Sequence, residues 1–231
     1  MDFDGFRFRH FSVAHGGCAM KVGTDGVLLG AWAVGGMRVL DVGTGSGLVA
    51  LMMAQRFADA GVTAIDIEPG ACAQARENVA RSPFAGRVNV VMSALQDFKA
   101  EPFDSIVCNP PFYSGTPASR TAERTMARSA ATLPFAALFS HAARLLTADG
   151  VLSVIVPASV RGVFDVEAAL AGLYPLRACG VKTVSRKPVG RWLLAYGKCS
   201  RGAVETEEHV LSNDGRERSE WYAGLTKEFY L

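Results

Sequence analysis

The sequence contains no long hydrophobic run. A membrane-spanning helix needs about 20 consecutive apolar residues, whereas the longest weakly polar stretch, residues 26–37, is interrupted by glycines. Residues 1–8 mix charges with aromatic side chains and lack the basic head and continuous apolar segment of a secretory signal. We therefore expect no membrane-spanning helix, no membrane partner and a location in the cytoplasm.

Spacings typical of metal sites and disulfide frameworks are also missing. The five cysteines lie far apart without a Cys-x-x-Cys pair, and the four histidines show no His-Glu-x-x-His or His-x-Glu spacing. A structural zinc site or a zinc hydrolase needs such closely spaced ligands, and a disulfide framework needs an even number of cysteines. We expect reduced, mostly buried cysteines and no bound metal.

Neither an internal repeat nor a linker rich in Pro, Gly and Ser divides the chain. With 231 residues, of which 49% are apolar, the chain is long enough for one globular domain and too short for two large ones. We expect a monomer or a weak homo-oligomer.

The small net charge of +2 hides an uneven distribution. Residues 110–200 carry eleven basic and four acidic side chains, a net +7, and both flanking regions are net negative. A positive face of this kind attracts an anionic polymer. A solvated surface without such a partner is the alternative interpretation, because charge counts contain no geometry.

From residue 38 onward, short β-branched runs alternate with longer amphipathic segments. This alternation predicts an α/β, Rossmann-like fold in which helices cover a mostly parallel seven-stranded sheet. Two extended segments without a helix between them predict a closing antiparallel hairpin. The expected strands are 39–42, 62–66, 88–92, 103–108, 151–156, 176–184 and 192–197, and the expected helices are 48–58, 69–81, 135–146 and 160–173.

We expect three regions within this single domain. Residues 1–35 form a small N-terminal extension with a short hairpin and a helix over 24–33, and this extension is predicted to cover the cofactor site. Residues 36–200 form the core, and residues 201–231 form a C-terminal segment packed on it.

A glycine-rich loop, Asp41-Val-Gly-Thr-Gly-Ser-Gly47, follows the first core strand and opens a helix. The glycines let the backbone approach a ligand, and the helix start offers free N–H groups. The spacing differs from the Gly-x-Gly-x-x-Gly that cradles a pyrophosphate. Asp41 suits a cationic amino group and repels phosphate. Both features favour S-adenosylmethionine over a dinucleotide.

Asp66 ends the second strand, where an acidic residue accepts hydrogen bonds from a ribose diol, and Ile67 beside it is placed against an adenine face. A strand-to-helix turn with structural glycines is the alternative for the whole motif. The candidate cofactor-binding residues from these two strand ends are Asp41, Gly43, Thr44, Gly45, Gly47, Asp66 and Ile67.

The fourth strand ends in the tetrapeptide Asn109-Pro110-Pro111-Phe112. The prolines stiffen the backbone, so that the Asn109 amide oxygen and the Pro110 carbonyl can accept the two N–H bonds of a planar exocyclic amine. Phe112 is then placed to stack on the ring that carries the amine. Accepting both N–H bonds makes the nitrogen a better nucleophile for a methyl group. A turn with a packed Phe is the alternative.

Asn109–Phe112 and the 41–47 loop resemble class I S-adenosylmethionine-dependent methyltransferases that modify exocyclic or amide nitrogens. Residues 11–15 and 18–33 resemble the N-terminal segment of the bacterial tRNA(Val) adenine-N6 methyltransferases, and residues 221–231 resemble their C-terminal end. The likeness spans nearly the whole chain. It implies S-adenosylmethionine as cofactor and, as substrate, adenine 37, just 3′ of the anticodon of tRNA(Val).

The resemblance also implies roles for single residues. Segment 21–25 contributes Lys21, Gly23, Thr24 and Asp25 over the cofactor, and Asn109 lies beside both cofactor and target amine. The chain departs from the pattern at Ser93-Ala94-Leu95, where such enzymes often carry an Asp for the adenine amine. That contact comes from the backbone, from Asp97 or is absent. Phe112 replaces a common tyrosine and is also usual in guanine-N2 enzymes of rRNA.

Two groups of basic residues are candidates for RNA contacts through phosphates. The first is a flap over 113–132, and the second is the turn of the closing hairpin. The candidate residues are Arg120, Arg124, Arg128, Arg186, Lys187 and Arg191.

The sequence thus predicts N6 methylation of a flipped adenine in tRNA by direct in-line transfer. The alternatives are an rRNA guanine-N2 methyltransferase, a protein glutamine-N5 methyltransferase, and a cofactor-binding RNA module without turnover.

Overall fold

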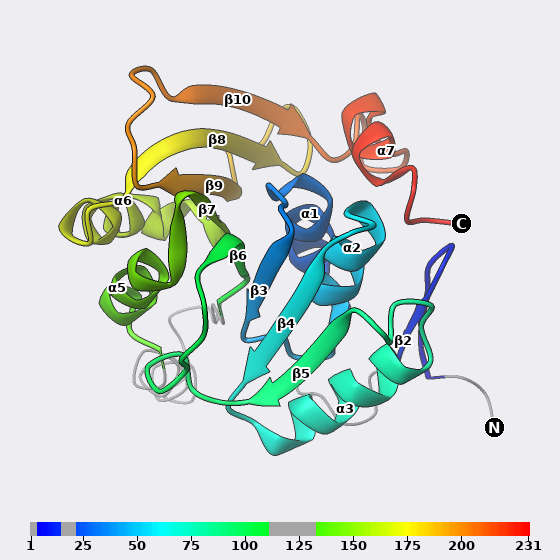
Figure 1. The fold of residues 1–231 in the computed structure, drawn as a ribbon. Helices are drawn as coiled ribbons and strands as arrows, with labels where there is room; N and C mark the ends of the chain where they lie inside the picture. Colours follow the sequence, from blue (N-terminus) through cyan, green and yellow to red (C-terminus); the bar gives the residue numbers. More distant parts are fainter. Residues whose placement is uncertain (1–3, 15–21, 111–132) are drawn as a thin grey trace, which may run out of the picture.

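A computed structural model describes residues 4–14, 22–110 and 133–231. Its centre is an eight-stranded sheet with the strand order β10-β8-β9-β7-β6-β3-β4-β5. Figure 1 shows this sheet crossing the molecule, with α5 and α6 on one side and α2 and α3 on the other. The strands of the sheet are β3 (Arg38–Val42), β4 (Gly61–Asp66), β5 (Val88–Met92), β6 (Phe103–Cys108), β7 (Leu146–Pro157), β8 (Tyr174–Lys182), β9 (Arg191–Gly197) and β10 (Glu205–Val210).

All pairings in the sheet are parallel except those of β9, which runs antiparallel to β7 and to β8. The expected parallel core and closing hairpin are therefore confirmed. The sheet has one strand more than the expected seven, because β10 pairs with β8 at the outer edge. Its sequence, Glu-Thr-Glu-Glu-His-Val, carries charges typical of a protected edge strand and lacks an apolar run.

Helices cover both faces of the sheet. They are α1 (Thr24–Trp32), α2 (Leu48–Arg56), α3 (Pro69–Ala80), α5 (Phe135–Leu145), α6 (Arg161–Leu170) and α7 (Glu220–Thr226), with a short 3-10 turn at Ala158–Val160. One hydrophobic core lies between the sheet and α1, α2 and α3, and a second lies beneath α5 and α6. Because the central strands are buried on both faces, they read as nearly continuous apolar runs.

The N-terminal residues pack on the side of the sheet that α2 and α3 cover. The hairpin of β1 (Gly5–Arg7) and β2 (Ser12–Ala14) lies beside α3 and the chain end, where Arg9 N–H donates to the Phe229 carbonyl at 2.8 Å. Helix α1 packs closely on α2, since a Cβ added at Gly30 would lie 2.7 Å from the Met52 sulfur. That this extension covers the cofactor site stays a prediction, because residues 15–21 lie outside the described part.

The C-terminal segment contributes β10 and then α7, which packs against α1. Ser219 caps α7 by accepting a hydrogen bond from the Tyr222 N–H at 3.1 Å. No helix within the described ranges combines the length and the apolar composition that crossing a membrane requires.

Candidate cofactor and catalytic site

The predicted cofactor and catalytic segments begin side by side at one edge of the sheet. Strand β3 pairs with β4 and with β6, so that Val42 lies opposite Ile65 on one side and Cys108 on the other. The glycine loop follows Val42, Asp66 follows Ile65, and Asn109 follows Cys108. Three parallel strands therefore deliver these segments to their shared carboxyl edge, which is where open α/β sheets bind ligands.

The glycine loop turns sharply between β3 and α2. Gly43, Gly45 and Gly47 have φ angles of 69°, 56° and 83°, a region that other residues rarely adopt. The N–H groups of Gly43 and Thr44 donate to the Ile65 carbonyl at 2.9 and 3.0 Å and fasten the loop to β4. Among the residues that the structure describes, a Cβ at Gly43 or Gly45 would meet no atom within 4 Å, so none of them fills the space beside these two glycines.

Asp41 lies beneath this loop and is 1% exposed. Its Oδ2 accepts hydrogen bonds from the Thr44 hydroxyl at 2.6 Å and from the Ala50 N–H at 3.1 Å. Burial raises the pKa of Asp41 to about 7, although both hydrogen bonds favour the carboxylate. Asp41 therefore holds the loop against the start of α2, and its carboxyl group is not presented openly to a ligand.

Asp66 supports the loop from the neighbouring strand. Its Oδ2 accepts from the Gly45 N–H at 2.9 Å and its Oδ1 from the Glu68 N–H at 3.0 Å. Each carboxylate oxygen has a further lone pair with which it can accept a hydroxyl proton. Ile67 is 42% exposed, which leaves an apolar surface beside this carboxylate.

The end of β5 lies next to Asp66, since the Ser93 N–H donates to the Asp66 carbonyl at 2.9 Å. Asp97 follows in an exposed turn, and its N–H donates to the Ala94 carbonyl at 3.2 Å. Asp97 is therefore not buried in the cofactor region. Its predicted alternative role at the adenine amine stays untested.

Asn109 and Pro110 directly follow β6, with Asn109 half-buried and Pro110 buried. Pro111 and Phe112 lie outside the described residues, as do Lys21, Arg120, Arg124 and Arg128. The described part thus places the first half of the catalytic tetrapeptide one strand away from the glycine loop.

Asn78 is a site residue that the sequence analysis missed. It lies on α3, is 1% exposed, and exchanges two hydrogen bonds with the backbone of Ala14, at 2.9 and 3.2 Å. Its amide also donates to the Ser46 carbonyl in the glycine loop at 2.9 Å. Asn78 therefore joins the N-terminal extension to the cofactor loop. No signal in the sequence pointed to it, because α3 also carries the polar residues Gln74, Arg76 and Glu77.

Thr24 and Asp25, which were predicted to lie over the cofactor, are the first two residues of α1. Gly23 precedes its first turn, and Asp25 in that turn accepts a hydrogen bond from Arg191 Nε at 2.9 Å. Arg191, predicted to contact RNA, is thus already paired across the sheet edge. Arg186 and Lys187 are exposed in the loop between β8 and β9, where the sequence predicted a basic turn.

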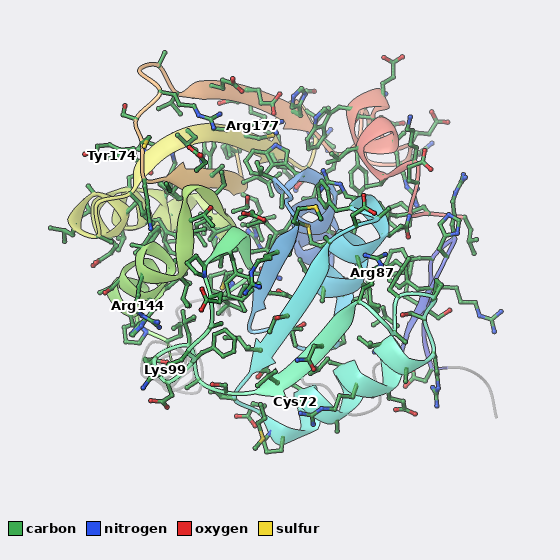
Figure 2. All side chains as sticks on the ribbon, in the orientation of Figure 1. Cys72, Arg87, Lys99, Arg144, Tyr174 and Arg177 are labelled. Atoms are coloured by element: carbon green, nitrogen blue, oxygen red, sulfur yellow. The ribbon has the colours of Figure 1, made fainter. Side chains whose placement is uncertain are left out.

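A second polar cluster lies between β8 and β10. One ligand atom from each of Cys179, Glu207 and His209 comes within 4.8 Å of the others, a grouping that could in principle hold a metal ion. Arg177, which Figure 2 shows on β8 beside β10, donates to Glu207 at 2.9 Å, and His209 approaches the same carboxylate at 3.0 Å.

The carboxylate of this cluster is already paired within the protein, with Arg177 and His209. Burial raises the pKa of the Cys179 thiol to about 12. Burial alone would raise the pKa of Glu207. Hydrogen bonds from His209 and Arg177 to its carboxylate together have the larger effect and lower the pKa. We interpret the cluster as a hydrogen-bond network. The sequence spacing had not predicted that these residues meet.

Comparison with known proteins decides the family. The sequence profile of the methyltransferase small domain matches residues 23–170. The chain is 42% identical, over 98% of its length and 97% of the other, to the "tRNA1(Val) (adenine(37)-N6)-methyltransferase" of Aeromonas salmonicida. The chain belongs to this methyltransferase family. A member from Bacteroides thetaiotaomicron is 41% identical, again over 98% of this chain and 97% of that one.

Solved structures support the same fold for this family member. A predicted O-methyltransferase from Agrobacterium tumefaciens has a TM-score of 0.65 at 18% identity, covering 89% of this chain and 96% of the other. A methyltransferase from Pyrococcus furiosus has a TM-score of 0.56 at 21% identity, covering 80% and 91%. The expectation of a class I methyltransferase fold is therefore confirmed.

Proposed function

We propose that this protein transfers the methyl group of S-adenosylmethionine to the exocyclic N6 of an adenine in tRNA, namely adenine 37 of tRNA1(Val). The observation that carries the proposal is the meeting of the glycine loop, Asp66 and Asn109 on adjacent strands. Full-length identity of about 40% to relatives named for this reaction supports the substrate.

The residues present fit the cofactor. The open space beside Gly43 and Gly45 accepts the amino acid portion, and the Asp66 carboxylate has lone pairs for the ribose hydroxyls. Ile67 supplies the apolar surface for the adenine ring. When bound, S-adenosylmethionine supplies an electrophilic methyl group on its sulfonium.

The chain's own contribution is to position the target nitrogen. The lone pair of an adenine N6 is delocalised into the ring, which makes the amine a weak nucleophile. When the Asn109 amide oxygen and the Pro110 carbonyl accept its two N–H bonds, the nitrogen becomes more pyramidal and more nucleophilic. In-line placement against the methyl group would then supply most of the rate. The N–C bond would form as the S–C bond breaks and S-adenosylhomocysteine leaves, and the methylated nitrogen would lose one proton to solvent without a strong general base.

The exposed Arg186 and Lys187 are proposed to hold RNA phosphates near this site. The flap arginines Arg120, Arg124 and Arg128 are proposed for the same role from the sequence alone. A flipped adenine enters the site more readily from a single-stranded loop than from a duplex, which fits a base beside the anticodon.

The test is incubation of the purified protein with S-adenosylmethionine and unmodified tRNA, followed by nucleoside mass spectrometry. We expect N6-methyladenosine from the wild type, and no methylated nucleoside from Asn109→Ala despite retained cofactor binding. The matched control is Asn89→Ala, at an exposed position on β5. N2-methylguanosine, or methyl transfer only to a glutamine-containing protein, would overturn the proposed substrate.

A further inference from the structure

A cavity of about 410 Å³ opens where β8 and β10 end, within the size range of small-molecule sites. The ends of these two strands form its floor, and the start of α7 closes one side. The loops after each strand complete it. The lining residues are Lys182, Ser185, Glu208, His209, Val210, Asn213, Ser219, Glu220 and Trp221.

The charges of this cavity disfavour a phosphate. The ammonium group of Lys182 is already paired with Glu208 at 2.6 Å, and Glu220 adds a second carboxylate to the lining. A phosphate entering the cavity would meet both carboxylates. A ring with an exocyclic amine suits it better, because carboxylates accept N–H bonds and the Asn213 amide can both donate and accept.

Aromatic surface is also present. The rings of His209 and Trp221 stack with their centroids 4.5 Å apart and an interplanar angle of 5°. His209 Nε2 lies 3.0 Å from the Glu207 carboxylate, so Nδ1 is the ring nitrogen that a ligand can approach. Stacking surface combined with mixed donors and acceptors is what proteins use to bind unpaired RNA bases.

The cavity lies at the same sheet edge as the catalytic segment. Lys182 and Val210 end strands that run parallel to β6, which ends beside Asn109. Four strand spacings of about 4.8 Å separate β10 from β6, or about 19 Å across the sheet. Arg186 and Lys187 follow Lys182 in the connecting loop, and both are exposed.

From this arrangement we infer that the cavity receives a second unpaired base of the RNA, one that is not methylated. The inference rests on the proposed function, because it takes the substrate to be a tRNA loop. The catalytic segment holds the target adenine, the basic loop holds the backbone, and the cavity binds another base of the same loop. The enzyme would thus select its RNA by a base that it does not modify.

The experiment measures binding of a fluorescently labelled anticodon stem-loop by anisotropy, with each loop nucleotide in turn made abasic. For the wild type, we expect one abasic position other than the target to weaken binding 5- to 20-fold. The double variant Asn213→Ala, Glu220→Gln should bind the intact stem-loop as weakly as the wild type binds that abasic stem-loop. Making the same nucleotide abasic should then weaken binding by the double variant no further. Both residues are exposed, so the variant should fold, and its circular dichroism checks this. Asn89→Ala on the distant edge strand β5 is the control.

Several outcomes would overturn the inference. One is that no abasic position other than the target weakens wild-type binding, and another is that the double variant keeps the full sensitivity. A drop of about one in the salt slope of Lys182→Gln, the cation in the cavity lining, would indicate a phosphate contact in place of a base. Binding without N6 methylation of tRNA would instead contradict the proposed function and leave the cavity assignment intact.

Discussion

Arg191 on β9 and Asp25 in the first turn of α1 form an ion pair, with Nε and Oδ2 2.9 Å apart. From the sequence, Arg191 was expected to contact RNA, and Asp25 was expected to lie over the cofactor. In the structure, the pair instead links the N-terminal helix to the hairpin that carries the basic loop. Both side chains are about one third exposed, so the pair contributes at most about 1 kcal/mol to stability.

We predict that Arg191 acts mainly through Asp25. Arg191→Gln and Asp25→Asn should each raise the KM for S-adenosylmethionine by about threefold, and the double variant should add little to either. The salt slope of RNA binding should stay unchanged in Arg191→Gln and fall by about one in Lys187→Gln. Steady-state kinetics and a salt titration measure these effects. Additive losses, or a reduced slope for Arg191→Gln, would restore a direct RNA contact.

Asn78 should couple stability to cofactor binding. Asn78→Ala removes four hydrogen bonds, including one accepted from Gln74, and leaves the Ala14 N–H and the Ser46 carbonyl without these partners, which should cost about 2–4 kcal/mol. Urea unfolding measures this loss. Where the variant remains folded, the KM for S-adenosylmethionine should rise more than that for tRNA. Equal rises in the two KM values would indicate a general loss of structure only.

Asp66 should contribute mainly to cofactor affinity. Asp66→Ala removes a charged acceptor for the ribose hydroxyls and also the support of the Gly45 N–H, so affinity should fall about 10- to 100-fold. Isothermal titration with S-adenosylmethionine measures it, and Asp59→Ala, an exposed aspartate before β4, is the control. An unchanged Kd for Asp66→Ala would remove this residue from the cofactor site.

Asp41 should make stability depend on pH. Its pKa is about 7 in the folded state and near 3.8 when unfolded, so between these values the folded protein keeps a proton that the unfolded chain releases. The free energy of unfolding should therefore fall as pH rises from about 4 to 7, by at most about 1.4 kcal/mol per pH unit from this group. Above pH 7 and below pH 4 this contribution is constant.

The check on Asp41 is a comparison of urea unfolding at several pH values. Asp41→Asn keeps an acceptor for Thr44 and Ala50 but cannot ionise, so its unfolding profile should be flatter between pH 4 and 7 than that of the wild type. The measurement is made without cofactor, because a cationic ligand would favour the carboxylate. Parallel profiles would contradict the raised pKa.

The sequence by itself determined the parallel core and the position of the cofactor loop. Both depend on local pattern, because buried strands are apolar runs and a glycine loop between a strand and a helix is visible in the order of residues. The segments starting at Gly43, Asp66 and Asn109 were placed correctly at one edge, since consecutive parallel strands end on the same side.

Only the tertiary structure decided the partners of the polar side chains. Strand β10 escaped prediction because its charged residues gain their hydrogen bonds from β8, and no local pattern records a parallel neighbour. Asn78 meets Ala14 across 64 residues, and Arg191 meets Asp25 across 166. A hydrogen bond between distant residues depends on where packing brings the backbone, and residue type alone does not reveal its partner.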